Sequence, residues 1–348
     1  MEETGKKKGS AKKVLLIILV ALLLLLVVVV TAGRIFVNSF LNKLDRGEIT
    51  GDLNLREEEI YEEETVDATD SVEHIGEAQK EFEDVQQIDP LKNANIKNIL
   101  LIGSDRRSTG ENGRSDSMIL VTMNFDTGKI HLTSLMRAMY VNIPRSDGDV
   151  WGMLNAAYSW GGPKLLIDTI ENNFRVHIDH YVIVDFSSFK LAVDILGGVT
   201  LTLSDEEAFV VSGWSRIPTT SGTVHLCGEQ ALVYARIRYI DNDFMRTSRQ
   251  RNVIEALMKK AIGSDLATLM SLADQILPYV NTNLNNVEIL YYLSKAPGLL
   301  KNPITQRMLP IENEAGKTYT GKIYVNGREM YKVDFETNIK ALHEFMLS

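Results

Sequence analysis

The chain has 348 residues, of which 45% are hydrophobic and 24% charged, so it can bury a sizeable core. A single cysteine, Cys227, excludes a fold held together by internal disulfides. The net charge of −9 is unevenly spread: residues 1–44 carry +5, residues 45–90 hold 17 acidic and 3 basic residues, and residues 91–348 are close to neutral. Because its folded part has no basic field, we expect no nucleic-acid partner.

The N-terminal segment predicts a membrane anchor. Residues 14–32 form a run of 19 uncharged, mainly apolar residues, about the length with which an α-helix crosses the hydrocarbon layer. Five lysines precede this run, so the positive-inside rule places residues 1–13 in the cytoplasm as a basic head. A cleaved signal peptide is the alternative, but the run is long for one and no small-x-small site ends it. We expect a transmembrane helix at residues 14–33 in a single-pass cell-membrane protein whose remaining chain is extracytoplasmic.

The next segment, residues 34–90, is predicted to be an acidic extracytoplasmic linker or stalk. Its apolar residues show little periodicity, and its acidity is typical of a solvated or loosely helical chain. We interpret this segment as a spacer between the membrane and a folded domain that spans residues 91–348.

Short β-rich runs bounded by turn residues begin near residue 98. Two of them flank an Asp-Thr-Gly turn at residues 126–128, which predicts a β-hairpin. Helical and strand-like segments alternate afterwards, and this favours the α/β class: an αβα sandwich with a central mixed sheet flanked by helices. The expected strands are residues 98–104, 117–125, 129–136, 180–186 and 199–203, with helices at 154–172, 187–196, 228–238 and 246–262, two more up to 295, and a strand pair and helix within 321–347.

Acidic residues at two strand ends predict a metal site. Asp105 follows one expected strand directly, and Asp116 lies just before the next. Because strand ends open onto a shared crevice, two carboxylates there repel each other unless a cation lies between them. Mg²⁺ prefers oxygen ligands and commonly combines one or two carboxylates with substrate phosphates. Asp105 and Asp116 are therefore a candidate magnesium site, and a polar loop with capping aspartates is the alternative.

Arginines form a second group of candidates. Arg137 follows a hairpin strand, and five arginines fall within residues 236–251, where Arg246, Arg249 and Gln250 share a helix face by their spacing. A planar guanidinium binds phosphate through paired hydrogen bonds, so the cluster fits a pyrophosphate site. The alternatives are a solvated helix with ion pairs to neighbouring aspartates, and a nucleic-acid surface, which the interleaved acids disfavour.

Other chemistries find less support. The chain has no Gly-Lys-Ser/Thr of a phosphate-binding loop near residues 103–116 and no Gly-x-Ser-x-Gly nucleophile elbow. His177 and His180 flank Asp179 with no third ligand nearby, so we expect structural roles for both.

Taken in order, several runs of the chain resemble the LytR-CpsA-Psr proteins of bacterial envelopes. They lie within residues 96–260 and read NILLIGSDRR, GRSDSMILVTMN, HLTSLMRAMYVNIP, LNAAYSWGGP, HYVIVDFSSFKLAVDILGGV and LCGEQALVYARIRYIDNDFMRTSRQR. The resemblance implies an αβα fold with a hydrophobic tunnel for a polyprenyl tail. It also implies an Mg²⁺-dependent phosphotransferase that moves an undecaprenyl-pyrophosphate-linked anionic glycopolymer, of teichoic acid or capsule type, onto peptidoglycan.

The resemblance assigns roles residue by residue. Asp105 and Asp116 match the magnesium-associated acids, and we expect one of these two carboxylates to assist deprotonation of the acceptor hydroxyl. Arg137 is expected to act in catalysis as well as in binding. The diphosphate contacts that the resemblance implies are Arg114, Arg137, Arg236, Arg238, Arg246 and Gln250.

One residue departs from the family's pattern. The family usually carries Asp after the arginine of its Ser-x-x-Arg run, whereas this chain has Ala138. If that acid only orients Arg137, its loss frees the guanidinium; if it is the general base, turnover falls by about 10² to 10⁴. The alternatives to a transferase are a binding-only or regulatory paralogue, of the kind labelled transcriptional attenuator, and a polyprenyl-diphosphate hydrolase.

Overall fold

The computed structural model describes Ser39 and residues 72–348 except 105–114, 239, 242, 265–267, 269–270, 272–274, 300 and 312–320. The chain divides into two units, residues 1–43 and 44–348, and the description below concerns the second. The predicted transmembrane segment, residues 14–33, lies outside the described residues. Among the helices that are described, none combines the length and apolar character that a membrane span requires.

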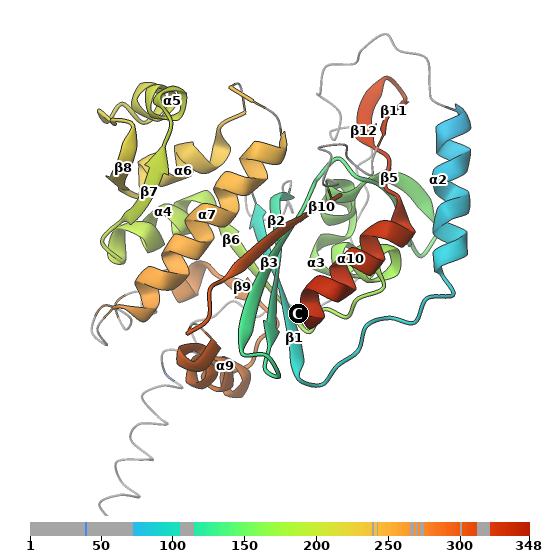
Figure 1. Ribbon diagram of the computed structural model, residues 1–348, viewed down its shortest axis with the longest axis horizontal. Helices are drawn as coiled ribbons and strands as arrows, with labels where there is room; N and C mark the ends of the chain where they lie inside the picture. The colour runs from blue at the N-terminus through green and yellow to red at the C-terminus, as the bar shows by residue number, and fades with distance from the viewer. Residues whose placement is uncertain are drawn as a thin grey trace, which may run out of the picture. The chain divides into compact units, whose positions relative to one another are not determined.

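A mixed sheet forms the centre of the described domain, as predicted, and it has six strands (Figure 1). Strand β1 pairs in parallel with β6 and antiparallel with β2, and β2 and β3 form the predicted hairpin across the turn at residues 126–128. The order is β10-β3-β2-β1-β6-β9, with bounds Thr305–Leu309, Lys129–Leu135, Ser115–Asn124, Ile96–Ser104, His180–Asp185 and Asn281–Thr282.

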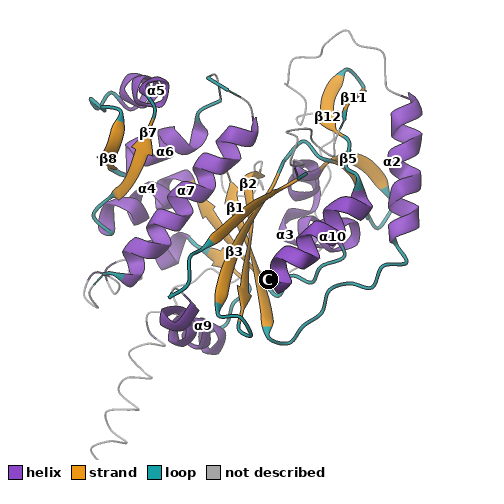
Figure 2. Ribbon diagram, viewed as in Figure 1, coloured by secondary structure: helices purple, strands orange, loops and turns teal. Residues whose placement is uncertain are grey.

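Helices cover both faces of this sheet, which confirms the layered fold (Figure 2). On one face, Leu100 and Ile102 of β1 belong to a buried cluster with residues of α3 (Leu154–Phe174) and α10 (Phe335–Leu347). Ile99 and Leu101 alternate with them and pack in a second cluster with residues of α7 (Asp243–Ile262) and α9 (Asn286–Leu299). The alternation of β1 side chains therefore joins the two helical layers through one strand.

A third cluster lies between α4 (Phe186–Ile195), α5 (Asp205–Ser215), α6 (Gly228–Arg236) and the hairpin of β7 (Val199–Leu203) with β8 (Gly222–Leu226). Helices α4 and α6 approach so closely that a Cβ on Gly228 would lie 2.3 Å from the carbonyl oxygen of Lys190. A glycine at this position therefore lets the two helices that border the candidate site pack against each other. The smaller strands are β4 (Tyr140–Ile143), β5 (Val150–Met153), β11 (Lys322–Val325) and β12 (Arg328–Tyr331).

Helix α2 (Val72–Val85) falls inside the segment that the sequence predicted to be linker, yet it packs on the domain. Ala78, Phe82 and Val85 are buried, and the Phe82 ring lies edge-on to Trp151 at 5.3 Å and to Phe335 at 5.7 Å between centroids. Spacings of three and four residues put these apolar side chains on one face of the helix. The surrounding acids hide this short stripe in the composition, and the folded domain extends at least to Val72.

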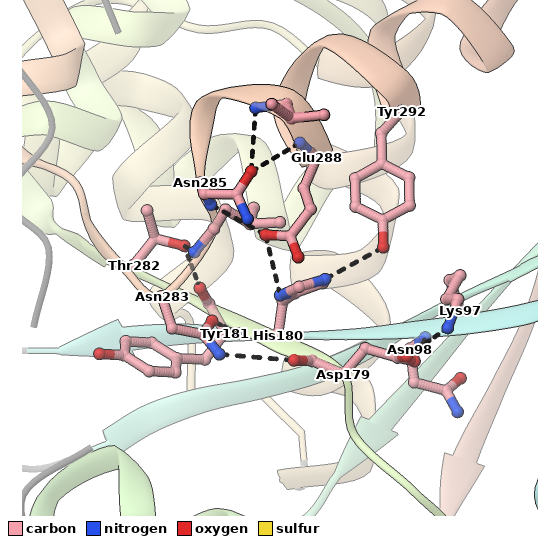
Figure 3. A network of polar contacts seen from close by, with 12 residues as sticks. Lys97, Asn98, Asp179, His180, Tyr181, Thr282, Asn283, Asn285, Glu288 and Tyr292 are labelled. Carbon is pink, nitrogen blue, oxygen red and sulfur yellow. Dashed lines mark hydrogen bonds and ion pairs between the residues drawn. The ribbon is translucent and has the colours of Figure 1, made fainter. Parts of the chain in front are cut away.

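At the end of the sheet where β1 and β6 begin, a polar network joins both strands to α9 (Figure 3). Lys97 Nζ lies 2.7 Å from Asp179 Oδ1, and the backbone N–H of Asn98 donates to Asp179 Oδ2 at 2.9 Å. His180 Nε2 lies 3.1 Å from Tyr292 Oη, and burial lowers the pKa of His180. Within the described residues no group of three or more His, Cys, Asp or Glu is arranged to hold a metal ion. These contacts agree with structural roles for the histidines.

The packing of α2 generates a stability prediction. Phe82→Ala removes a buried ring from between two aromatic neighbours, so the free energy of unfolding should fall by about 3 to 5 kcal/mol. Urea unfolding followed by circular dichroism measures this change, with Lys80→Ala on the exposed face of α2 as the matched control. If both variants changed the free energy of unfolding by the same small amount, α2 would be part of the linker and not of the folded domain.

Candidate functional site

Five of the predicted site residues border one cavity of about 290 Å³, close to the ends of β1 and β6 and the start of β2. Residues of α4, α6 and α7 also line it. Arg137 is not among the lining residues but contacts Asp116, which is. Its polar lining residues include Asp116, Arg236, Arg238, Arg246 and Gln250. Its apolar lining residues include Val184, Phe186, Phe189, Leu232, Val253 and Ile254. The cavity is therefore bordered by both charged and apolar side chains.

Asp116 reaches the cavity because of a β-bulge. Gly103 of β1 pairs with Ser117, whereas the next residue, Ser104, pairs with Ser115, so Asp116 is the extra residue in β2. A bulge of this kind changes the direction of a side chain at a strand end. Asp116 Oδ1 lies 3.7 Å from Arg137 Nη1 and 3.6 Å from Arg238 Nη2. The carboxylate thus has two guanidinium groups within ion-pair distance.

Arg137 lies in a turn directly after β3. The backbone N–H of Met139 donates to the carbonyl of Met136 at 3.3 Å, and the carbonyl of Ala138 accepts from the N–H of Tyr331 in β12 at 2.8 Å. The side chain is 14% exposed, and its Nε lies 3.7 Å from Asp243 Oδ2. A turn held from both sides therefore presents Arg137 between the carboxylates of β2 and α7.

Arg236 is the last residue of α6, whereas Arg238 lies beyond the end of that helix. The predicted helix at residues 228–238 ends at Arg236, because Ile237 has extended backbone angles (φ −58°, ψ 128°). The Arg236 guanidinium lies 4.6 Å from the centre of the Phe186 ring, a cation–π contact with α4. Arg238, beyond the helix end, is 38% exposed and pairs with Asp116. The break in the helix brings both arginines to one cavity although they are two residues apart.

Arg246 is the most buried charge of the group. The residue is 2% exposed, and its Nη2 donates to Asp243 Oδ2 at 2.8 Å. Its Nε and Nη1 are buried and make no hydrogen bond to any residue in the described ranges. Burial lowers the pKa of Arg246 to about 10 against the opposing effect of Asp243, so the side chain stays protonated near neutral pH. A buried guanidinium with two unsatisfied donors at a cavity wall is suited to bind an anion.

The remaining arginines of the sequence cluster do not face the cavity. Arg249, predicted on the same face as Arg246, instead donates to Glu207 at 2.7 Å, to Asp241 and to the carbonyl of Ile237 at 3.2 Å. Arg251 donates to Gln306 Oε1 at 3.1 Å. Arg249 thus fixes the segment that carries Arg238. For Arg249 and Arg251, the alternative interpretation of a helix engaged in polar contacts within the protein is the better description.

Asp243 and Tyr331, which contact Arg137 or the turn that carries it, were not predicted to lie near the site. Asp243 entered the sequence argument only as a partner in surface ion pairs, and Tyr331 belongs to the C-terminal segment, which suggested no site residue. The Tyr331 ring lies edge-on to Phe244 at 5.4 Å, and burial, followed by the charge of Asp243, raises the pKa of Tyr331. Asp243 opens α7, where a helix start favours an acid, but no feature of the sequence signalled Tyr331.

Asp105 and Arg114 lie outside the described residues, so the structure gives one carboxylate of the predicted magnesium pair. Asp185, the residue paired with Ser104 across β6, also borders the cavity but accepts from the N–H and hydroxyl of Ser188 as the cap of α4. Asp116 offers carboxylate oxygens beside a cavity lined by guanidinium groups. Such a donor fits Mg²⁺, which takes its other ligands from phosphates and water.

The chain matches the LytR_cpsA_psr family over residues 60–344. It is 34% identical over 256 residues, 70% of this chain and 76% of the relative, to the polyisoprenyl-teichoic acid–peptidoglycan teichoic acid transferase TagU of Oceanobacillus iheyensis. It is 37% identical over 232 residues, 62% of this chain and 56% of the relative, to biofilm regulatory protein A of Streptococcus mutans. The crystal structure of Bacillus subtilis TagV superposes with a TM-score of 0.59 at 29% identity, covering 73% of this chain and 98% of that chain. Since the family match spans most of the chain, the protein belongs to the LytR-CpsA-Psr family.

Proposed function

We propose that the protein is a phosphotransferase that moves an undecaprenyl-pyrophosphate-linked anionic glycopolymer, of teichoic acid or capsule type, onto peptidoglycan. The observation that carries this proposal is Arg246, a buried guanidinium with two unpaired nitrogens on a residue that lines a cavity bordered by charged and apolar side chains. Relatives named as teichoic acid transferases support the same substrate class.

The charges suit a diphosphate. Arg137, Arg236, Arg238 and Arg246 bring four positive charges, and Asp116, Asp185 and Asp243 bring three negative ones, so these described groups carry a net charge of about +1. A diester-linked diphosphate carries about two negative charges, which would more than neutralise this excess in a partly desolvated site. The apolar lining residues, among them Phe186 and Phe189, offer the first isoprene units of a prenyl chain a surface that excludes water.

In the proposed reaction, an acceptor hydroxyl of peptidoglycan attacks the phosphorus that bears the glycopolymer. A new P–O bond forms to the acceptor, the bridging P–O bond of the diphosphate breaks, and undecaprenyl phosphate leaves. Asp116, or Asp105 from the other strand end, takes the hydroxyl proton. Arg236, Arg238 and Arg246 stabilise the negative charge that develops on the leaving phosphate. Magnesium held by Asp116 and Asp105 would supply further neutralisation of that charge.

Loss of one of the arginines expected to bind the diphosphate should abolish most turnover without unfolding the protein. Arg238 is partly exposed, so Arg238→Ala should keep its melting temperature while transfer falls about 10²-fold or more, as when one charge-stabilising donor is removed. Single-turnover release of undecaprenyl phosphate by the full-length protein in detergent measures this, with Arg145→Ala as control. Unchanged transfer would contradict the assignment of Arg238.

The same assay separates the competing functions. Equal release with and without peptidoglycan indicates a hydrolase that uses water as acceptor. Binding of the lipid-linked polymer without any release by the wild type indicates the binding-only paralogue that Ala138 raised as an alternative.

Magnesium dependence is a separate prediction. EDTA should stop turnover and Mg²⁺ should restore it, and Asp116→Asn should raise the Mg²⁺ concentration needed for half-maximal turnover by about tenfold or more. The rise in melting temperature that Mg²⁺ and pyrophosphate produce together should shrink in the same variant, whereas Asp205→Asn on exposed α5 should behave as wild type. Full activity in EDTA would show that the site works without the metal.

We propose that residues 14–33 anchor the protein in the cell membrane with its N-terminus in the cytoplasm, which would present the site to lipid-linked substrates outside. Removal of residues 2–33 should move the protein from the membrane to the soluble fraction. Protease added to intact protoplasts should cut the full-length protein within residues 34–348. Protection of that segment would reverse the proposed orientation.

A further inference from the structure

Asp243 connects two of the arginines in the candidate site. Its Oδ2 lies 2.8 Å from Arg246 Nη2 and 3.7 Å from Arg137 Nε, so one carboxylate oxygen faces both guanidinium groups. Its side chain is 18% exposed, and screening by water is correspondingly weak. The two arginines come from α7 and from the turn after β3, and Asp243 is the point at which these elements meet electrostatically.

Each arginine has a physical reason to depend on this carboxylate. Arg246 is 2% exposed, and a buried positive charge without a nearby anion is strongly unfavourable. Arg137 is followed by Ala138, so the adjacent residue contributes no carboxylate to orient it. Asp243 also occupies the first turn of α7, where the positive end of the helix dipole favours an acid, and it lies three residues before Arg246 on the same helix.

The surroundings hold Asp243 in place. The next residue, Phe244, packs edge-on against Tyr331, and the N–H of Tyr331 donates to the carbonyl of Ala138 beside Arg137. Strand β12 therefore braces the start of α7 and the Arg137 turn together. The distance between Asp243 and Arg137 is set by packing as well as by charge.

We infer that Asp243 is the positioning residue of the diphosphate site: it fixes Arg137 and Arg246 in place of an acid at residue 138. This inference rests on the proposed function. It implies that Asp243 opposes binding of the substrate anion, because it already neutralises part of the positive charge, while it holds the guanidinium groups where transfer requires them. A residue with this role affects turnover and affinity in different directions.

The test compares Asp243→Asn with wild-type full-length protein in two measurements. Calorimetric titration with inorganic pyrophosphate should give an affinity that is unchanged or higher, because one negative charge has left the site. Single-turnover transfer should fall about 10- to 100-fold, since a displacement of about 1 Å in a catalytic group can cost that much. Glu255→Gln is the matched control: this carboxylate also lies on α7, is 21% exposed, and contacts Lys259 and Gln306 instead of the site. Wild-type turnover in Asp243→Asn would overturn the inference.

Loss of Asp243 could also unfold the protein around an unpaired Arg246, and the conservative variant Asp243→Glu covers that outcome. It keeps the charge but moves the carboxylate by one methylene. A normal melting temperature and pyrophosphate affinity with turnover reduced several-fold would support positioning. Wild-type turnover in this variant, combined with loss of folding in Asp243→Asn, would reduce Asp243 to a structural ion pair and overturn the inference.

A double-mutant cycle separates this inference from the proposed function. Asp243→Asn and Arg137→Gln are combined, and pyrophosphate affinity is measured for all four proteins. Effects that deviate from additivity by about threefold or more would show that Asp243 acts through Arg137, even if the wild type failed to transfer polymer and the proposed function fell. Additive effects would overturn the positioning role whatever the turnover data showed.

Discussion

The buried charge of Arg246 constrains the arrangement of the whole site. Its guanidinium is out of water, and one of its nitrogens is satisfied by Asp243 while two others face no acceptor in the described residues. Such a group is tolerable only if a carboxylate stays close and if the open donors have a use. Asp243 meets the first condition by its place at the start of α7. The second condition links the buried charge to an anion entering the cavity, which is the basis of the diphosphate proposal.

The surrounding fold can be understood as the means of bringing charges from distant segments together without neutralising them fully. A β-bulge directs Asp116, a helix break separates Arg236 from Arg238, and a braced turn presents Arg137. Asp116 lies 3.6 to 3.7 Å from its arginine partners, which is within ion-pair range but longer than a good hydrogen bond. Loosely paired groups can exchange partners at small cost when a phosphate arrives. Arg249, by contrast, is bound to two carboxylates and a carbonyl, and serves the scaffold.

The presence of Ala138 takes on a different meaning in this setting. From the sequence, its substitution for an acid suggested either a freed Arg137 or a lost base. The structure has a carboxylate facing Arg137 from another element, Asp243, together with a brace from Tyr331 in the C-terminal hairpin. The missing acid at residue 138 therefore does not by itself imply an impaired paralogue, because Asp243 can orient Arg137 instead. The terminal segment, which seemed remote from the chemistry, contributes to the geometry of the site.

Sequence alone determined the family, the mixed sheet with helices on both faces, the β2–β3 hairpin and most of the cavity's charged residues, because strand and helix periodicities and short motifs are local properties of the chain. It could not place α2, whose apolar stripe of Ala78, Phe82 and Val85 is hidden among acids and becomes meaningful only against Trp151 and Phe335. Only the tertiary structure divided the arginine cluster into Arg246, which borders the cavity, and Arg249, which turns away. It alone brought Asp243 to Arg137, since that proximity depends on the start of α7 lying beside the turn after β3 and on packing by β12. Spacing along a helix limits which residues share a face, but the partner that each face meets depends on contacts between segments far apart in the chain.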